Sequence, residues 1–277
     1  MKLTGADIIC ECLLEQGVDT VFGYPGGAAL NTYDALYRYS DRINHILTAH
    51  EQGASHAADG YSRATGKVGV CLATSGPGAT NLVTGIATAM LDSIPMVAIT
   101  GQVSTQLLGK DVFQEADIVG CCEPFVKYSY LIKDVDEIPK VFKEAFYIAN
   151  SGRKGPVLID IPIDIQNAQI KKFEYPEEVN MRTYKPTVKG NMVQIKKVIR
   201  ELERSNKPII CVGGGVILSE AEKEVIAFAE KYQIPVVSTM MGIGTMPSLH
   251  PLYMGMAGNN GNLAANRAIH DADTVIL

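Results

Sequence analysis

Three apolar runs of the sequence each end in small or polar residues, and a helix-like stretch follows each of them. Residues 20–22 lead into GYPGG, residues 43–48 lead to Glu51, and residues 68–73 lead into TSGPG at 74–78. A fourth run, 95–100, is continuously apolar, as expected for a strand that is covered on both faces. Strands that alternate with helices in this way predict an α/β fold built on a parallel sheet.

The same rhythm predicts two domains. Residues 1–165 hold the first set of strands and helices, whereas 166–188 (QNAQIKKFEYPEEVNMRTYKPTV) is charged, contains two prolines and has no periodicity. We interpret 166–188 as an interdomain linker. A second α/β unit follows at 189–277, with a glycine triplet after its first strand. The chain ends in DADTVIL, which is typical of a strand that begins, so we expect the second domain to be truncated.

Composition and charge restrict the partners. The chain has a net charge of −5 and its basic residues are dispersed, which gives no electrostatic reason to expect nucleic acid or an anionic membrane. No apolar run approaches the length of a membrane span, and the N-terminus shows no signal-peptide cleavage site. The six cysteines have no metal-ligand spacing, so we expect buried thiols, no metal site in this chain and a reduced, cytoplasmic compartment.

Glu51 is the most informative single residue. An acid in the first turn of a helix gains about 0.3–1 kcal/mol from the helix dipole, which is one explanation for its position. The alternative is that its carboxylate faces a bound cofactor. Ligands of parallel sheets bind beyond the carboxyl ends of the strands, where Glu51 and the two glycine turns are predicted to converge. TSGPG matches neither GxxxxGK[ST] nor GxGxxG, so a tight structural turn remains an alternative for that stretch.

Five blocks of the sequence resemble one enzyme family. They read GYPGGA, HEQGASHAADGYSRATGKVGV, TSGPGATNLVTGIATAMLDSIPMVAITGQV, DVFQEADIVG and SGRKGPVLIDIPIDIQ. In these blocks and their spacing the chain resembles the large catalytic subunits of acetolactate synthase (acetohydroxyacid synthase), which depend on thiamine diphosphate. FQEAD and residues 153–166 favour the biosynthetic, FAD-containing type. Another thiamine-diphosphate carboligase or decarboxylase is the less favoured alternative.

The resemblance implies a domain order. Residues 1–165 would form the pyrimidine-binding domain, and 189–277 an incomplete, Rossmann-like central domain that associates with FAD. The pyrophosphate-binding domain, which holds the magnesium ligands in this family, is absent from these residues. Because family active sites lie between subunits, we expect the isolated chain to be inactive. A non-catalytic cofactor-binding or dimerisation module is the alternative to an enzyme.

The resemblance also implies roles for single residues. Glu51 would be catalytic, because a carboxyl group at N1′ of the aminopyrimidine favours the tautomer that removes the C2 proton of thiamine. The other residues expected on the thiamine diphosphate side are Tyr24, Pro25, Gly26, Thr74, Pro77, Asn81 and Gln114. Those expected on the FAD side are Arg153, Gly213, Gly214, Gly215, Thr239, Met240 and Met241. Those expected at the substrate channel are Phe113, Gln114 and Lys127, with Gln102 beside it.

The implied reaction is the decarboxylation of pyruvate and its carboligation to pyruvate or 2-ketobutyrate, in branched-chain amino-acid biosynthesis. The implied cofactors are thiamine diphosphate, Mg²⁺ and a structural FAD. The implied partners are a second copy in a homodimer or larger assembly and a regulatory small subunit. One segment departs from the family pattern, because Asn259 and Asn260 replace a Met-His pair in a flavin-contacting stretch.

Overall fold

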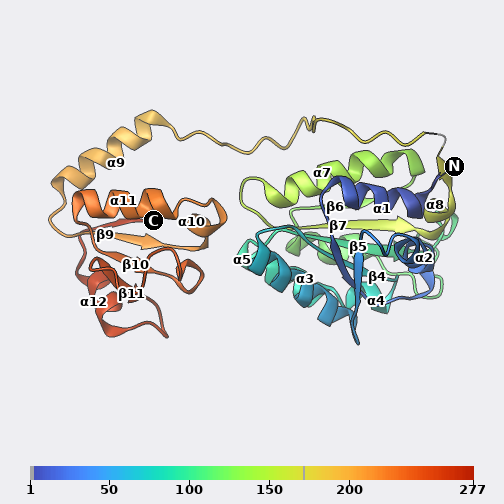
Figure 1. Cartoon of the computed structure of the whole chain (residues 1–277), viewed down its shortest axis with the longest axis horizontal. Coiled ribbons are helices and arrows are strands. Elements are labelled where there is room, and N and C mark those ends of the chain that lie inside the picture. The colour runs from blue at the N-terminus through green and yellow to red at the C-terminus, as the bar shows by residue number, and fades with distance from the viewer. Residues whose placement is uncertain (1–2, 171) are drawn as a thin grey trace. The chain divides into compact units, whose positions relative to one another are not determined.

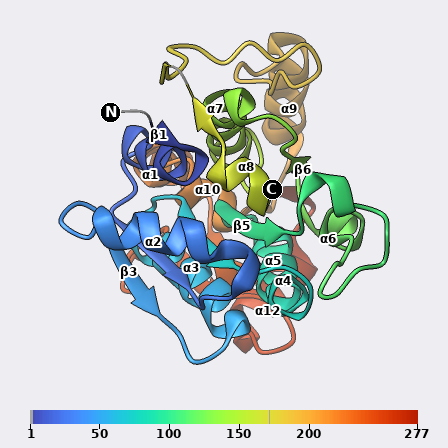
Figure 2. The same cartoon turned by 90° about the vertical axis from the view of Figure 1, so that its right-hand side faces the viewer.

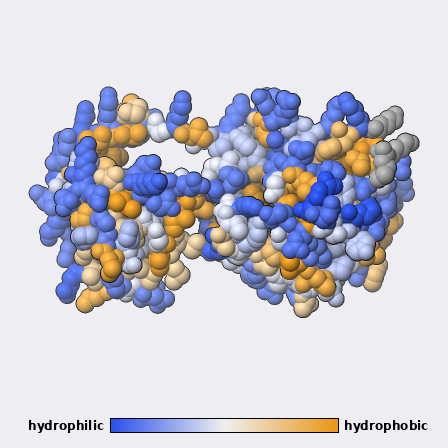
Figure 3. Space-filling model, in the orientation of Figure 1, coloured by the Kyte–Doolittle hydropathy of each residue, from blue (hydrophilic) through white to orange (hydrophobic). Residues whose placement is uncertain are grey.

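The computed structural model describes residues 3–170 and 172–277, and it divides into two compact units, residues 1–186 and 187–277. Figure 1 shows both units as layers of helices around a central sheet. Figure 3 shows hydrophilic residues spread over the visible face of each unit. None of the helices in the described ranges is long and apolar enough to cross a membrane.

The first unit contains a six-stranded sheet in the order β3-β2-β4-β5-β7-β6, and all of its strand pairs are parallel. Its strands are β2 (Thr20–Gly23), β3 (Asn44–Leu47), β4 (Gly69–Ala73), β5 (Met96–Gln102), β6 (Tyr128–Leu131) and β7 (Pro156–Pro162). The short strands β1 (Leu3–Thr4) and β8 (Gln169–Ile170) form a separate antiparallel pair. The predicted parallel α/β fold is therefore confirmed.

Helices cover both faces of this sheet (Figures 1 and 2). They are α1 (Gly5–Glu15), α2 (Leu30–Arg38), α3 (Glu51–Thr65), α4 (Pro77–Thr80), α5 (Val83–Asp92), α6 (Ile118–Cys122), α7 (Ile138–Asn150) and α8 (Ile163–Asn167). One core cluster joins the sheet to α1, α2 and α7, and a second joins it to α3, α5 and α6. Every residue of β4, β5 and β7 is buried, which explains why these strands read as continuous apolar runs.

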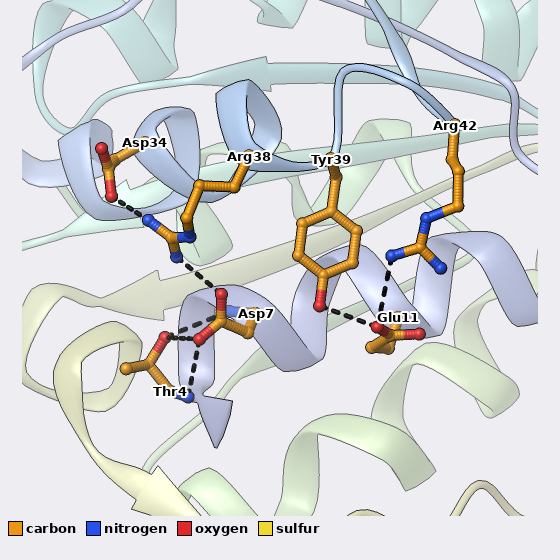
Figure 4. Close-up of polar contacts among 7 residues, drawn as sticks. All are labelled: Thr4, Asp7, Glu11, Asp34, Arg38, Tyr39 and Arg42. Atoms are coloured by element: carbon orange, nitrogen blue, oxygen red, sulfur yellow. Dashed lines mark hydrogen bonds and ion pairs between the residues drawn. The ribbon is translucent and has the colours of Figure 1, made fainter. Parts of the chain in front are cut away.

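A polar network between two helices of this unit ties α1 to the end of α2 (Figure 4). Asp7 accepts hydrogen bonds from the hydroxyl of Thr4, at 2.6 Å, and from the guanidinium of Arg38, at 2.6 Å. The Tyr39 hydroxyl donates to Glu11 at 2.7 Å. These contacts cap α1 and join two helices that pack on the same face of the sheet.

The segment predicted as a linker packs largely with the first unit. Residues 163–170 form α8 and β8, and Phe173, Tyr175 and Tyr184 rest on the core cluster below α1 and α7. The side-chain amide of Gln16 donates to the Tyr175 hydroxyl at 2.7 Å. The boundary between the units falls at 186/187, because these aromatic side chains bury against the first unit even though their spacing follows no helix or strand period.

The second unit has a four-stranded sheet in the order β11-β10-β9-β12, and its three strand pairs are parallel. Its strands are β9 (Pro208–Val212), β10 (Val236–Ser238), β11 (Tyr253–Met256) and β12 (Thr274–Ile276). Its helices are α9 (Met192–Arg204), α10 (Gly214–Leu218), α11 (Glu222–Tyr232) and α12 (Leu263–Asp271). The predicted Rossmann-like, parallel α/β character of this region is confirmed. The single helix predicted at 219–232 is preceded by the short helix α10.

Candidate active site

Three segments converge at the carboxyl edge of the first sheet. The GYPGG turn follows β2, Glu51 comes shortly after β3, and the TSGPG turn follows β4. These strands are direct neighbours in the order β3-β2-β4 and run parallel. Their carboxyl ends therefore bring the three segments to one place, as the sequence predicts.

Glu51 is the first residue of α3, and His50 precedes it as the N-cap, accepting a hydrogen bond from the Gln52 backbone N–H at 3.1 Å. The Glu51 side chain is half-buried. Its Oε2 accepts a hydrogen bond from the side-chain amide of Asn81 at 3.0 Å. Within residues 3–170 and 172–277, no group is recorded as donating to Oε1. One carboxylate oxygen is therefore oriented by Asn81, and the other is available to a ligand.

Two glycines lie in close contact with Thr74, next to Glu51. A Cβ added at Gly26 would lie 2.4 Å from the Thr74 Cγ2, and one added at Gly78 would lie 2.6 Å from the same atom. The Gly78 Cβ would also lie 3.1 Å from the Glu51 Oε1. The Thr74 hydroxyl accepts a hydrogen bond from the Ala28 backbone N–H at 3.0 Å. The glycines thus let two turns approach each other closely while leaving room at the carboxylate.

The TSGPG turn also contacts the segment that contains FQEAD. Gly76 has φ of +57°, and a Cβ there would lie 2.7 Å from the backbone oxygen of Gln114. Pro77 then opens α4. Phe113, next to Gln114, is 87% exposed. The structure therefore brings together most of the residues predicted on the thiamine diphosphate side, including Gly26, Glu51, Thr74, Asn81 and Gln114. Tyr24 and Pro25 lie exposed in the turn that follows β2.

Lys127 and Arg153 lie elsewhere. Lys127 precedes β6, and its backbone N–H donates to Pro156 O at the start of β7, so it lies at the amino edge of the sheet. Its Nζ donates to the carbonyls of Ile148 and Ser151 and to the Tyr184 hydroxyl. The first unit therefore does not place Lys127 at a channel beside Glu51, because its ammonium group caps the end of α7 instead.

Arg153, the residue predicted to contact FAD, lies in the loop before β7, also at the amino edge. Its Nε donates to the Ser93 hydroxyl at 2.8 Å, and its Nη2 lies 3.4 Å from the carbonyl oxygen of Leu91. These acceptors are at the end of α5. Within the first unit the guanidinium is a helix C-terminal cation, which the dipole of α5 favours.

In the second unit, the two turns predicted on the FAD side pack against each other. A Cβ at Gly214 would lie 3.1 Å from the Met241 Cβ, and the Thr239 backbone N–H donates to Val212 O at 2.8 Å. Residues 213–215 and 239–241 thus meet at the carboxyl ends of β9 and β10. Asn259 and Asn260 are exposed in the turn after β11, which is held by two hydrogen bonds between Asn266 and Gly258.

Two buried polar residues behind the Glu51 site are absent from the sequence predictions. Gln166, inside the predicted linker, donates to the backbone oxygen of Ala28 at 2.7 Å and accepts from Thr32. Asp160 is 2% exposed and accepts from Thr100 at 2.6 Å and from Gln102 at 2.9 Å. Burial raises the pKa of Asp160 to about 7. The sequence does contain a signal for Asp160, which is the only acid in the apolar run PVLIDIP. An acid that is buried in such a run needs hydrogen-bond partners.

No group of three or more potential metal ligands occurs among the histidine, cysteine, aspartate and glutamate side chains in the described ranges.

Comparison with known proteins gives two family matches. Residues 3–121 match the model "Thiamine pyrophosphate enzyme, N-terminal TPP binding domain", and residues 195–277 match "Thiamine pyrophosphate enzyme, central domain". The first match covers the Glu51 site, and the second covers the paired turns of the second unit.

Individual relatives match along nearly the whole chain. The acetolactate synthase large subunit of Haemophilus influenzae is 50% identical over 276 residues, which cover 99% of this chain and 48% of that protein. The acetolactate synthase isozyme 3 large subunit of Escherichia coli is 49% identical over 274 residues, with 99% and 48% covered. The probable acetolactate synthase large subunit of Methanocaldococcus jannaschii is 51% identical over 276 residues, with 99% and 46% covered.

The chain therefore spans about half the length of these relatives. Its parallel sheets agree with both family matches. The chain belongs to the thiamine pyrophosphate enzymes, and along its whole length it is similar to the N-terminal portion of acetolactate synthase large subunits.

Proposed function

We propose that this chain acts in an acetolactate synthase, as the cofactor-binding N-terminal part of the large catalytic subunit. The reaction joins two pyruvate molecules into 2-acetolactate with loss of CO₂, or pyruvate and 2-ketobutyrate into 2-aceto-2-hydroxybutyrate. These products belong to branched-chain amino-acid biosynthesis. The observation that carries the proposal is the identity of about half of all positions, along 99% of the chain, to relatives that bear this name.

The space beside the Glu51 carboxylate is where an aminopyrimidine ring would bind in this proposal. The free Oε1 lies beside Gly78, where the lack of a side chain leaves space next to the carboxylate. Thiamine diphosphate, when bound, supplies the carbon nucleophile for the 2-keto acid and takes up the electrons released as CO₂ leaves. In this proposal Glu51 holds a proton at N1′ of the ring, and Asn81 fixes the direction of the carboxylate. Roles of this kind contribute about 10²–10⁴-fold to a rate.

The neighbouring residues orient the ring and shape access to it. Thr74, held between Gly26 and Gly78, sets the distance between the turns that follow β2 and β4. Gln114 lies on the Gly76 turn, and the exposed Phe113 side chain beside it is available to line a substrate channel. We assign Lys127 no role at this pocket within the same unit.

A chimera tests this proposal. Residues 1–277 would replace the matching N-terminal 48% of the Haemophilus influenzae large subunit, and acetolactate formation from pyruvate would be measured with thiamine diphosphate and Mg²⁺. We expect an active chimera, and at least ~100-fold lower kcat in the Glu51→Gln chimera because the proton at N1′ is no longer held by an acid.

The matched control is Glu222→Gln. Glu222 is also an acid in the first turn of a helix, α11, but lies in the second unit. If helix electrostatics alone explained Glu51, both variants would behave alike. Near-normal turnover by a folded Glu51→Gln chimera would contradict the catalytic role, and an active chimera that uses other 2-keto acids but makes no acetolactate would favour a different carboligase or decarboxylase.

A non-catalytic cofactor-binding or dimerisation module is the second candidate for the 277-residue chain by itself. The observation that favours it is that the chain spans about half the length of its relatives. We expect no acetolactate from the chain alone with pyruvate, thiamine diphosphate and Mg²⁺. Clear product formation would show that these residues suffice for catalysis.

We further propose that the second unit binds FAD as a structural group, and that Mg²⁺ is held outside this chain. The support is the packing of the 213–215 turn on the 239–241 turn at the carboxyl ends of β9 and β10. A flavin absorbance spectrum of the purified chimera, with and without Asn259→Met and Asn260→His, tests retention. We expect bound flavin in both proteins and tighter retention in the double variant.

The remaining partners follow from the same proposal. We expect a homodimer or larger assembly with the active site between subunits, a regulatory small subunit and a cytoplasmic location. Sedimentation of the chimera with and without the small subunit of the same organism measures both associations.

A further inference from the structure

The segment that follows β5 contacts the turn that follows β4, which lies beside Glu51. We refer to residues 103–117 as the 103–117 loop. It carries Phe113 and Gln114, and the backbone of Gln114 rests on Gly76, with the Gln114 oxygen 2.7 Å from where a Gly76 Cβ would be. The position of this loop therefore determines how closely its backbone packs on the turn that follows β4.

The backbone of the loop is strained. Asp111 has φ of +55° and Gln114 has φ of +57°. Residues other than glycine in this left-handed region cost about 1–3 kcal/mol each, and they persist only where surrounding contacts hold them. Two such residues within four positions require specific restraints on the loop.

One restraint lies within the loop. The Glu115 carboxylate accepts hydrogen bonds from the backbone N–H groups of Gly109 and Val112, the latter at 3.1 Å. These two groups flank the strained Asp111. A second restraint holds the start of the loop, where the Thr105 backbone N–H donates to Asp164 at 3.0 Å.

The third restraint holds the end of the loop and is buried. The Gln102 side chain is 3% exposed, and its Nε2 donates to the backbone oxygen of Ala116 at 2.9 Å and to Asp160 at 2.9 Å. Its Oε1 accepts from the Val103 backbone N–H at 2.9 Å. The amide of Gln102 thus bridges both ends of the loop, and Asp160 on β7 fixes the orientation of that amide.

We propose that Asp160 is a positioning residue for the cofactor pocket: through Gln102 it fixes the 103–117 loop and so holds Gln114 on the Gly76 turn. The order of the loop follows from these contacts alone. Its consequence for thiamine diphosphate rests on the proposed function. Asp160 itself is buried on a central strand and touches no reacting group.

Hydrogen exchange of the 277-residue chain tests the loop without any cofactor. Asp160→Asn keeps a side-chain oxygen that can accept from Gln102, whereas Asp160→Val keeps none. We expect at least tenfold faster exchange at Leu107 and Glu115 in Asp160→Val. Exchange in α11 of the second unit should not change, and Asp160→Asn should restore wild-type exchange.

Two further variants make the result decisive. Asp7→Val removes another buried aspartate that is hydrogen-bonded to a threonine, on α1, and should lower stability without loosening the 103–117 loop selectively. If Asp160→Val does not fold, Gln102→Met removes the same bridge at nearly constant volume and should give the same selective tenfold change.

Unchanged loop exchange in a folded Asp160→Val or Gln102→Met variant would overturn the proposal, as would uniform acceleration across the whole first unit or failure of Asp160→Asn to restore exchange. In the chimera, Asp160→Val should also lower kcat/KM for pyruvate about tenfold while Asp160→Asn does not. An inactive chimera with selective loop loosening would refute the proposed function and leave the positioning role intact.

Discussion

The two edges of the first sheet use polar side chains in opposite ways. At the carboxyl edge, Glu51 keeps one carboxylate oxygen free beside Gly78, while Asn81 orients the other. At the amino edge, Lys127 and Arg153 direct their cationic groups at the carbonyls that end α7 and α5. The same parallel architecture thus gives one edge with groups available for a ligand and one edge whose cations are used to stabilise helix ends.

The largest expected effect concerns a buried acid near the carboxyl edge. Burial, with a smaller contribution from the charge of Asp117, raises the pKa of Asp160 to about 7, and hydrogen bonds from Thr100 and Gln102 act in the opposite direction. The folded state then binds this proton more tightly than the unfolded state. Stability should fall as pH rises from about 4 to about 7. Asp160→Asn should remove about 2–4 kcal/mol of this fall.

Urea unfolding of wild type and Asp160→Asn at pH 5 and pH 8 measures this difference. Taking the difference between the two proteins cancels the other titrating groups. A variant that tracks the wild type at both pH values would show that the Asp160 pKa is not raised.

The next largest effect is expected at Gly76. Gly76→Ala places a side chain at φ of +57° and against the Gln114 backbone oxygen, so we expect a loss of about 1–3 kcal/mol. Gly53→Ala is the matched control, because Gly53 lies in α3 near Glu51 and its Cβ would meet nothing closer than 4.0 Å. Urea unfolding provides both values. Equal stability of the two variants would contradict the close approach of the 103–117 loop.

At the amino edge, Lys127→Met should cost about 1–2 kcal/mol, because the carbonyl oxygens of Ile148 and Ser151 and the Tyr184 hydroxyl lose a charged donor. The contrast between the two edges predicts that Lys127→Met lowers the stability of the fold and leaves cofactor binding unchanged. In the chimera, thiamine diphosphate should bind Lys127→Met as it binds the wild type. Weaker cofactor binding at unchanged stability would place Lys127 at the pocket after all and would break the contrast between the two edges.

Arg153 should give the smallest effect. Its side chain is exposed and its acceptors lie at a helix end, so we expect Arg153→Ala to change the free energy of unfolding by about 0.5 kcal/mol or less. The flavin content of the chimera distinguishes the two roles considered for Arg153, which are a cation at the end of α5 and a contact with FAD. Loss of flavin with unchanged unfolding would support the predicted contact with FAD.

The sequence is sufficient to predict the convergence at Glu51, because strand direction and glycine turns are both visible in it. The position of Lys127 was not predicted, because the strand β6 that follows it was not among the predicted strands and the family resemblance placed this residue at the substrate channel. The role of Asp160 depends on which buried neighbours face it, and Gln102, 58 positions away, is brought there only by the pairing of β5 with β7. Gln166 is hidden in the same way, because its partners lie far back in the chain.

The pairing of β1 with β8 has a consequence for synthesis on the ribosome. Gly5 donates its backbone N–H to Ala168 O at 2.8 Å, a Cβ at Gly5 would lie 2.2 Å from Ile165 O, and Gln16 donates to Tyr175. The first helix therefore gains these contacts only after the chain has been translated as far as Tyr175. Such long-range closure slows folding, so a helix that is made before the sheet it packs on is among the last elements to be secured.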